Sequence, residues 1–196
     1  MLDDYALDTL FRKARSQNGW LPEPVSDAQL RAIYDLAKLG PTSANSSPAR
    51  FLLLRTDAAK ARLKPFLSDS NRDKTMSASV VAIIGYDTAF YEHLPRIFPH
   101  NQDAINWFKG AEKKAIADAT AFRNGTLQAG YFMLAARALG LDCGPMSGFD
   151  IQGVDREFWS GTTVRTNFLC SLGRGDPAKV YPRSPRLHFD EACKIL

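Results

Sequence analysis

The spacing of apolar and polar residues predicts a chain in which helices surround a single sheet. The clearest helix begins after Ser26, where apolar residues recur at helical spacing until Gly40 and Pro41 end it. Ser26 and Gln29 have the spacing of a capping box, in which each side chain satisfies a backbone N–H group of the other residue. Further helices are predicted over residues 4–14, 58–67, 120–139 and 150–159, and a last one from residue 190.

Three apolar runs predict strands. Residues 51–54 form a short, continuously apolar run, and residues 79–85 are apolar and rich in β-branched side chains, which is typical of a central strand. Residues 162–172 alternate imperfectly. Residues 86–110 have no strong period, and we interpret them as an excursion with short helices that borders the active site. The predicted fold class is α+β, with one domain over residues 1–196.

The predicted helix over residues 120–139 is apolar on nearly every side. A helix that is apolar all round is expected to be buried all round. In a chain of 196 residues this predicts a core helix that also meets a second subunit.

Composition and charge argue against some classes of function for this chain. The net charge is +4, but the lysines and arginines are scattered, which argues against nucleic-acid binding. No apolar run approaches the length of a membrane span. The three cysteines make no CxxC pair, which favours reduced thiols. Since the N-terminus also lacks the pattern of a signal peptide, we expect a cytoplasmic protein.

Several familiar catalytic patterns are missing from the chain. There is no GxGxxG after a strand, no Walker A motif and no GxSxG elbow. The three histidines have no paired ligand spacing, so no metal site is expected. Any hydride chemistry must therefore use a cofactor that is held without a Rossmann motif.

Four separated segments, in this order, resemble the nitroreductase-like FMN flavoprotein family. They are Gly40–Arg50, Asn71–Lys74, Gly144–Asp150, and Gly173–Asp176 together with Arg183–Arg186. The strings GPTSAN, SPAR, FRN, ALGLD, GPMSGFD and PRL, with the FYEHLP and FPH insert, are similar to the malonic semialdehyde reductase group of bacterial pyrimidine catabolism. The resemblance spans all but the first few residues.

The resemblance implies a mostly antiparallel sheet flanked by helices in an intertwined homodimer. It also implies FMN as cofactor, NADPH or NADH as co-substrate, and ping-pong transfer of hydride through flavin N5. The expected reaction is the reduction of malonic semialdehyde to 3-hydroxypropionate. A broad nitro- or quinone reductase is the alternative enzyme, and a non-catalytic flavin-binding dimer is the alternative of another class.

The resemblance also assigns residues to the FMN phosphate. Arg15, Ser16 and Arg186 would bind it, with Arg183 nearby, although exposed arginines are often only solvated. The family's usual pattern here is Arg-x-Ser-x-Arg, and Asn18 stands in place of the second cation. We therefore expect a looser hold on the phosphate.

A second group is expected around the flavin ring. Lys74 and Asn71 would meet the pyrimidine edge, where a cation stabilises the charge gained on reduction. The segment Pro145, Met146, Ser147 and Gly148 would follow the ring edge, with a backbone N–H group donating to N5. The proton for an aldehyde acceptor would come from water or the Ser147 hydroxyl.

Two further sets complete the expected site. In this family the loop containing Pro41, Thr42, Ser43 and Asn45 contacts FMN that is bound mainly by the other subunit. The carboxylate of malonic semialdehyde needs a cation, and Arg50 and Arg123 are candidates that could equally be surface charges.

Overall fold

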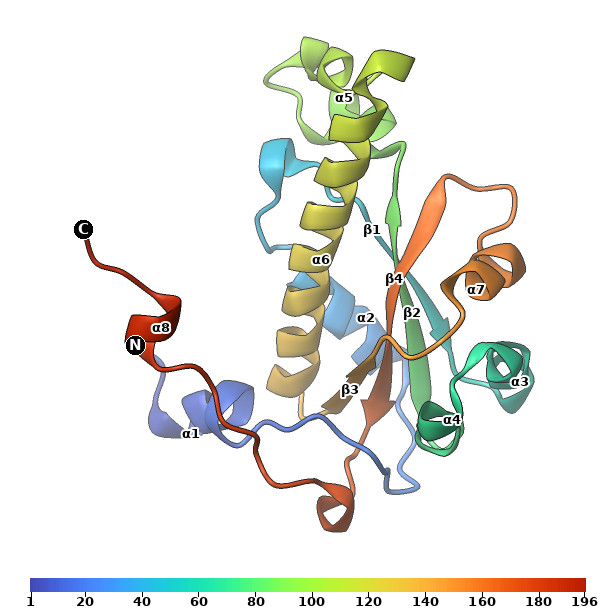
Figure 1. The fold of residues 1–196 in the computed structure, drawn as a ribbon, viewed down its shortest axis with the longest axis vertical. Helices are drawn as coiled ribbons and strands as arrows, with labels where there is room; N and C mark the ends of the chain where they lie inside the picture. The colour runs from blue at the N-terminus through green and yellow to red at the C-terminus, as the bar shows by residue number, and fades with distance from the viewer.

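The computed structural model describes residues 1–196 and contains one four-stranded sheet (Figure 1). Every neighbouring pair of strands is antiparallel, which confirms the predicted kind of sheet. The strand order is β1-β2-β4-β3, with bounds β1 Ala49–Leu54, β2 Val80–Asp87, β3 Asp142–Met146 and β4 Val164–Gly173.

Strand β3 is the strand that the sequence did not predict. It contains Gly144 and Pro145, which together look like a turn after a helix. Proline cannot donate to a sheet ladder, but β3 is an edge strand whose only partner strand is β4, so Pro145 is tolerated there.

Helices cover both faces of this sheet. The longer ones are α2 Asp27–Ala37, α3 Asp57–Leu63, α4 Asp69–Met76, α6 Lys114–Ala138 and α7 Ile151–Phe158. Short ones are α1 Asp4–Leu7, which continues as a π-helical turn Asp8–Arg12, then α5 Leu94–Ile97 and α8 Phe189–Ala192. The 3-10 turns are Ser43–Asn45, Lys64–Phe66, Phe90–His93, Gln102–Trp107, Ala111–Lys113 and Pro177–Lys179.

The predicted helices and strands are largely present, with shifted ends. The capping box of Ser26 and Gln29 is formed at the start of α2. Helix α6 begins at Lys114, before its predicted start. Helix α4 was not predicted, because its sequence DSNRDKTM has no apolar stripe.

The core has a layer on each face of the sheet. Helices α2 and α6 bury Ile33 and Phe132 against one face, and α3 and α7 bury Leu63 and Val154 against the other (Figure 1). Strand β2 is central, and its side chains from Val80 to Ile84 are fully buried between these layers. Such burial stabilises each large side chain by about 1.5–3 kcal/mol, which fixes the sheet as the frame for the site.

In the single chain, helix α6 is covered on only part of its surface, and the second subunit that the sequence predicts for the rest stays a prediction. Phe122 is 50% exposed and Leu127 is 45% exposed. Phe122 lies edge-on to Tyr86 of β2, with ring centres 5.5 Å apart, and both Phe122 and Leu127 remain partly uncovered in the single chain. The sequence of α6 has apolar residues on every side of the helix, but a single sheet can cover only the side that faces it.

Both ends of the chain lie on the same side of the molecule (Figure 1). The last segment, residues 181–196, is exposed throughout and carries α8. None of the helices combines the length and the apolar character needed to cross a bilayer. No group of three or more His, Cys, Asp or Glu side chains is placed to hold a metal ion.

Candidate functional site

Three distant segments meet beside the C-terminal end of β3. The Lys74 ammonium on α4 lies 3.3 Å from the Asn18 side-chain oxygen. The Asn71 side-chain amide donates to the Gly148 carbonyl at 3.0 Å. We call Asn18, Asn71, Lys74 and Gly148 the ring-edge group, after the role that the sequence predicts for most of them. The structure places Asn18 here, beside Lys74, whereas the sequence assigned it to the phosphate.

Local hydrogen bonds hold α4 in this position. The Trp20 indole donates to the Lys74 carbonyl at 2.8 Å, and the Ser68 N–H donates to the Gly148 carbonyl at 3.1 Å. The Thr75 hydroxyl is buried and lies 2.7 Å from the Asn71 carbonyl and 3.2 Å from the Met146 sulfur. The amide of Asn71 and the ammonium of Lys74 therefore start from a fixed backbone.

The segment after β3 runs along this group. Pro145 and Met146 are the last residues of β3 and pair with Cys170 and Leu169 of β4. Met146 is buried, whereas Ser147 and Gly148 are exposed just beyond the strand. A Cβ atom at Gly148 would lie 2.6 Å from the Asn71 amide nitrogen, so a side chain has no room there. The exposed hydroxyl of Ser147 is not hydrogen-bonded within the chain.

The arginines predicted for a phosphate divide into two sets. Arg183 donates to the carbonyls of Arg12 and Ala14, both at 2.8 Å, and Arg15 donates to the carbonyl of Tyr181. These contacts bring Arg15 and Arg183 to the same region. Arg186 is exposed, and its hydrogen bonds go only to its own neighbours in the chain.

A cavity of about 750 Å³ opens beside Arg15. Its lining includes the cation Arg174, the carboxylate Asp142 and the side chain of Gln17. Lys13 also lines it, but its ammonium is paired with Asp8 at 2.7 Å. The side-chain oxygen of Gln17 is buried without a hydrogen-bond partner. Ser16, next to it, is exposed and forms an isolated bridge with Cys143 of β3. The cavity thus places the guanidinium groups of Arg15 and Arg174 on the same wall as Gln17, whose side-chain oxygen accepts no hydrogen bond.

The loop from Pro41 to Asn45 lies elsewhere. The Ser43 N–H donates to the Asn124 side chain of α6 at 2.8 Å, and the Asn45 amide donates to the Ile97 carbonyl at 2.6 Å. Pro41 is exposed, and the Thr42 hydroxyl accepts from the Ser47 N–H at 3.1 Å. Figure 1 shows this turn beside α6, whereas α4 lies across the sheet from it. Within one chain, the loop does not join the ring-edge group.

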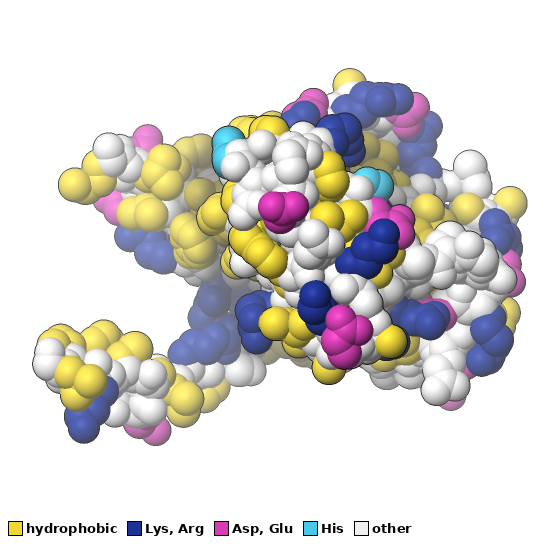
Figure 2. Space-filling view, turned by 90° about the horizontal axis from the view of Figure 1, so that it is seen from above, with side chains coloured by type: hydrophobic (Ala, Val, Ile, Leu, Met, Phe, Trp, Pro, Cys, Tyr) yellow, Lys and Arg dark blue, Asp and Glu magenta, His cyan; other side chains and the backbone are white.

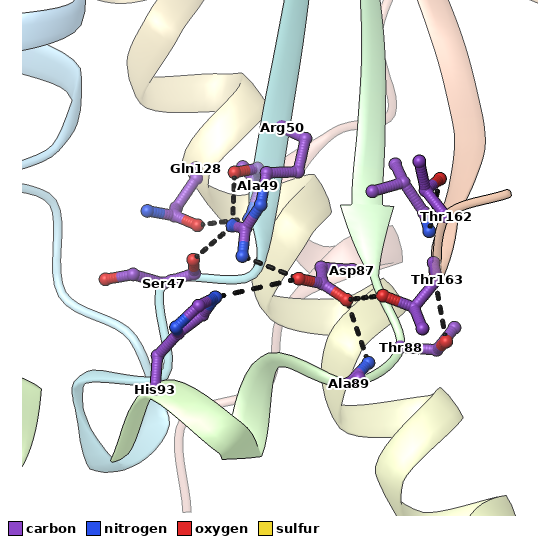
Figure 3. Close-up of polar contacts among 11 residues, drawn as sticks. Ser47, Ala49, Arg50, Asp87, Thr88, Ala89, His93, Gln128, Thr162 and Thr163 are labelled. Atoms are coloured by element: carbon purple, nitrogen blue, oxygen red, sulfur yellow. Dashed lines mark hydrogen bonds and ion pairs between the residues drawn. The ribbon is translucent and has the colours of Figure 1, made fainter. Parts of the chain in front are cut away.

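The two candidate cations for a carboxylate differ in their surroundings. Arg50 forms an ion pair with Asp87 at 2.7 Å, and its side chain is 29% exposed (Figure 3). Arg123 is exposed on α6 and forms no ion pair. The structure therefore holds Arg50 in a defined place and leaves Arg123 on the surface.

Sequence reasoning missed Gln17, Trp20 and Asp87. Gln17 and Trp20 fall in an irregular stretch between two helices, where no periodicity marks a buried side chain. Asp87 ends β2 and is 7% exposed, and its role depends on Arg50, which is far away in the sequence. A carboxylate at the end of a buried strand was the available signal for Asp87.

Comparison with known proteins gives one consistent result. A family model described as the nitroreductase family matches residues 12–173. A Cupriavidus pinatubonensis protein, named as a NADH dehydrogenase/NAD(P)H nitroreductase, is 60% identical over 189 residues, covering 96% of each chain. A Ralstonia pickettii protein of the same description, HadB, is 58% identical over 190 residues, covering 97% of each chain.

Solved structures share the fold at low sequence identity. A Bacillus subtilis nitroreductase superposes with a TM-score of 0.87 at 22% identity, covering 99% of this chain and 100% of its own. An Exiguobacterium sibiricum nitroreductase in complex with FMN superposes with a TM-score of 0.86 at 21% identity, covering 100% of this chain and 98% of its own. The architecture of the sheet and its helices is thus shared along the whole chain.

Proposed function

The chain belongs to the nitroreductase family, and from that premise we propose that it is an FMN-dependent oxidoreductase that passes hydride from NAD(P)H to a small organic acceptor. The observation that carries the proposal is the ring-edge group. A lysine, two side-chain amides and a glycine from three separate segments converge there. The names of the similar proteins, as NAD(P)H nitroreductases, support the same reaction class.

The residues present fit FMN in two respects. Lys74 forms no ion pair with a carboxylate, so its charge remains available to a ligand. Arg15 and Arg174 supply cations for a phosphate, and the unpartnered oxygen of Gln17 supplies an acceptor for a ribityl hydroxyl. The Exiguobacterium protein of the same fold holds FMN. When bound, FMN would supply a hydride carrier at N5.

The protein's own part in this reaction is electrostatic and positional. The Lys74 ammonium would stabilise negative charge on the pyrimidine edge of the ring, with Asn71 as a neutral hydrogen-bond donor. Gly148 leaves space for a ring to approach the backbone, because it has no Cβ atom. Ser147 offers an exposed hydroxyl close to that edge, which suits a proton donor for an acceptor.

We infer that the working form is a homodimer. Large apolar side chains are exposed on α6, among them Phe122 and Leu127. The C-terminal segment exposes Leu187, Phe189 and Ile195. Figure 2 shows apolar side chains on parts that stand off the main body, on the side where Figure 1 places both termini. Exposed apolar surface of this kind marks an interaction site.

A dimer would also explain the position of the Pro41–Asn45 loop. This loop lies apart from the ring-edge group of its own chain, so it would serve the ring-edge group of the partner. The measurement is the mass in solution by light scattering, for the full chain and for a chain ending at residue 180. We expect the full chain at twice its own mass and weaker association after truncation. A full chain that stays monomeric at micromolar concentration contradicts the dimer.

We propose malonic semialdehyde as the acceptor, since the resemblance of GPMSGFD and its companion strings points to that group. The names of the similar proteins favour a second candidate, a broad nitro- or quinone reductase. Steady-state rates with malonic semialdehyde, a nitroaromatic and a quinone separate the two. FMN-loaded protein that turns over nitroaromatics but not the aldehyde rules out malonic semialdehyde as the acceptor.

The experiment for the reaction class is a visible spectrum followed by anaerobic titration with NADPH and with NADH. We expect the purified or FMN-supplemented protein to retain a flavin band through gel filtration, and one of the nucleotides to bleach it. A protein that gains no flavin band on adding FMN is not a flavin enzyme. A band that neither nucleotide bleaches favours the non-catalytic flavin-binding dimer.

A further inference from the structure

One short segment of the chain holds Lys74 at both of its ends. The side-chain oxygen of Asn18 lies 3.3 Å from the Lys74 ammonium, and the Trp20 indole donates to the Lys74 backbone carbonyl at 2.8 Å. This carbonyl lies in the last turn of α4, where the carbonyls of a helix have no partner within the helix. The indole N–H therefore satisfies an acceptor that α4 itself leaves open.

The segment that carries Trp20 is fixed to the sheet by its backbone. The Gln17 N–H donates to the Cys143 carbonyl of β3 at 3.0 Å. The Leu21 N–H donates to the carbonyl of Arg174, which directly follows β4, at 2.8 Å. Trp20 therefore lies between two anchoring points on the sheet, so its backbone has a defined place.

Two glycines make room for the Trp20 ring on this sheet. A Cβ atom at Gly144 of β3 would lie 3.1 Å from Cζ2 of the ring, and one at Gly173, the last residue of β4, would lie 3.1 Å from Cε3. Cζ2 and Cε3 are opposite corners of the six-membered ring, so the ring spans both glycines. Carbon atoms in contact usually lie about 3.5–4.0 Å apart, so a methyl group at either glycine would displace the ring.

The end of α4 also has a support that does not involve Trp20. The buried ammonium of Lys60 donates to the carbonyls of Met76 and Ala78, both at 3.1 Å. These bonds hold the chain beyond Lys74. Loss of the indole N–H should therefore leave α4 folded, while the Lys74 carbonyl loses its partner.

From these contacts we propose that Trp20 is a positioning residue, which holds the Lys74 ammonium in place for the negative charge that the flavin gains on reduction. The inference rests on the proposed function and extends it to a side chain that acts through Lys74. Donors and charges that are fixed in advance stabilise a developing charge more than mobile ones, because they need no reorganisation. A loose Lys74 backbone should therefore weaken the hold on reduced flavin more than the hold on oxidised flavin.

The measurement is the ratio of the affinities for reduced and oxidised FMN, which follows from the midpoint potential of the bound flavin relative to free FMN. Trp20→Phe keeps an aromatic ring over the two glycines and removes the indole N–H. We expect the ratio to fall about three- to tenfold, the effect of one hydrogen bond. This fall lowers the midpoint potential by about 15–30 mV, since a tenfold change in a two-electron equilibrium is about 30 mV.

A double-mutant cycle separates positioning from a merely structural role. If Trp20 acts through Lys74, adding Trp20→Phe to Lys74→Gln should cause no further fall in the ratio. Trp159→Phe is the matched control, because the Trp159 indole also donates a hydrogen bond, to the Thr166 hydroxyl at 3.1 Å, and packs in the same layer of the core as Trp20. The control should lower the melting temperature without changing the ratio.

Three results overturn the inference. They are an unchanged ratio in Trp20→Phe, an equal fall when Trp20→Phe is added to Lys74→Gln, and a fall of the same size in Trp159→Phe. Gly173→Ala is a second variant in case Trp20→Phe does not fold, since its methyl group displaces the indole and should lower the ratio; an unchanged ratio there also counts against Trp20. A native protein that binds no FMN contradicts the proposed function, whereas an unchanged ratio in variants that bind FMN contradicts this inference alone.

Discussion

Gly148 gives the sharpest test of how the ring-edge group is built. A Cβ atom at this position would lie 2.6 Å from the Asn71 amide nitrogen and 2.9 Å from the Ser68 hydroxyl oxygen. Both distances are shorter than real contacts of a methyl group. The substitution Gly148→Ala must therefore displace Asn71, which is 8% exposed and donates to the Gly148 carbonyl.

The expected cost has two parts. Loss of the hydrogen bond from Asn71 costs about 1 kcal/mol, and the crowding costs about 1 kcal/mol more. For a chain of this size, about 2 kcal/mol lowers the melting temperature by about 4–8 °C. The affinity for FMN should fall as well, because Asn71 moves away from the position proposed for the ring edge.

The assay is thermal unfolding, followed by circular dichroism at one fixed protein concentration. Gly130→Ala is the matched control, since no atom lies within 4 Å of a Cβ atom built at Gly130, in the interior of α6. Alanine there should raise stability by about 0.5–1 kcal/mol, because glycine is a poor helix former. If Gly148→Ala melts within 1 °C of the native protein, the packing argument for Gly148 is refuted.

Three other changes test separate parts of the structure. Lys74→Gln should weaken FMN binding about tenfold, because one charge-assisted hydrogen bond is lost. Fluorescence titration measures the affinity, and a value unchanged within twofold means that Lys74 does not touch the cofactor. Ser26→Ala should cost about 1 kcal/mol in urea unfolding, and no change would mean that the capping box adds nothing. The hydrogen bond with Cys143, together with burial, raises the pKa of the Cys170 thiol well above its ordinary value of 9.0. The unfolded chain releases this proton first, so stability should fall as pH rises past that value, and Cys170→Ala should show a shallower fall between pH 8 and pH 10; equal slopes contradict the assignment.

Much of the fold follows from local pattern. The apolar run of β2 is long and β-branched enough to be recognised as a central strand, and its side chains are fully buried. The capping box marks the start of α2, because both partners lie within one helical turn. Strand β3 and helix α4 escaped prediction for the opposite reason. Pro145 is compatible with a strand only at a sheet edge, and α4 is held by contacts to Gly148 and Trp20 rather than by an apolar stripe.

The site divides in the same way. The motifs around Asn71, Lys74 and Gly148 can be read from the sequence, and two of these residues lie in hydrogen-bond contact in the structure. Their meeting with Asn18 could not be read, since the lysine and the asparagine are far apart in the chain. Because Asn18 stands in place of the second cation of the family's pattern, the sequence predicted a weaker phosphate site. In the folded chain, the side chain of Asn18 lies beside the Lys74 ammonium.

The sequence by itself determined the long helix, through its periodicity, and the family to which the chain belongs, through short motifs whose resemblance implied the antiparallel sheet. Only the tertiary structure decided which charges are already paired. Arg50 and Arg96 are both arginines near an apolar run, yet Asp87 holds the first in place and no carboxylate offsets the second. Whether a charge is neutralised depends on neighbours brought in by the fold, and electrostatic energy depends on the distance between groups in space rather than along the chain.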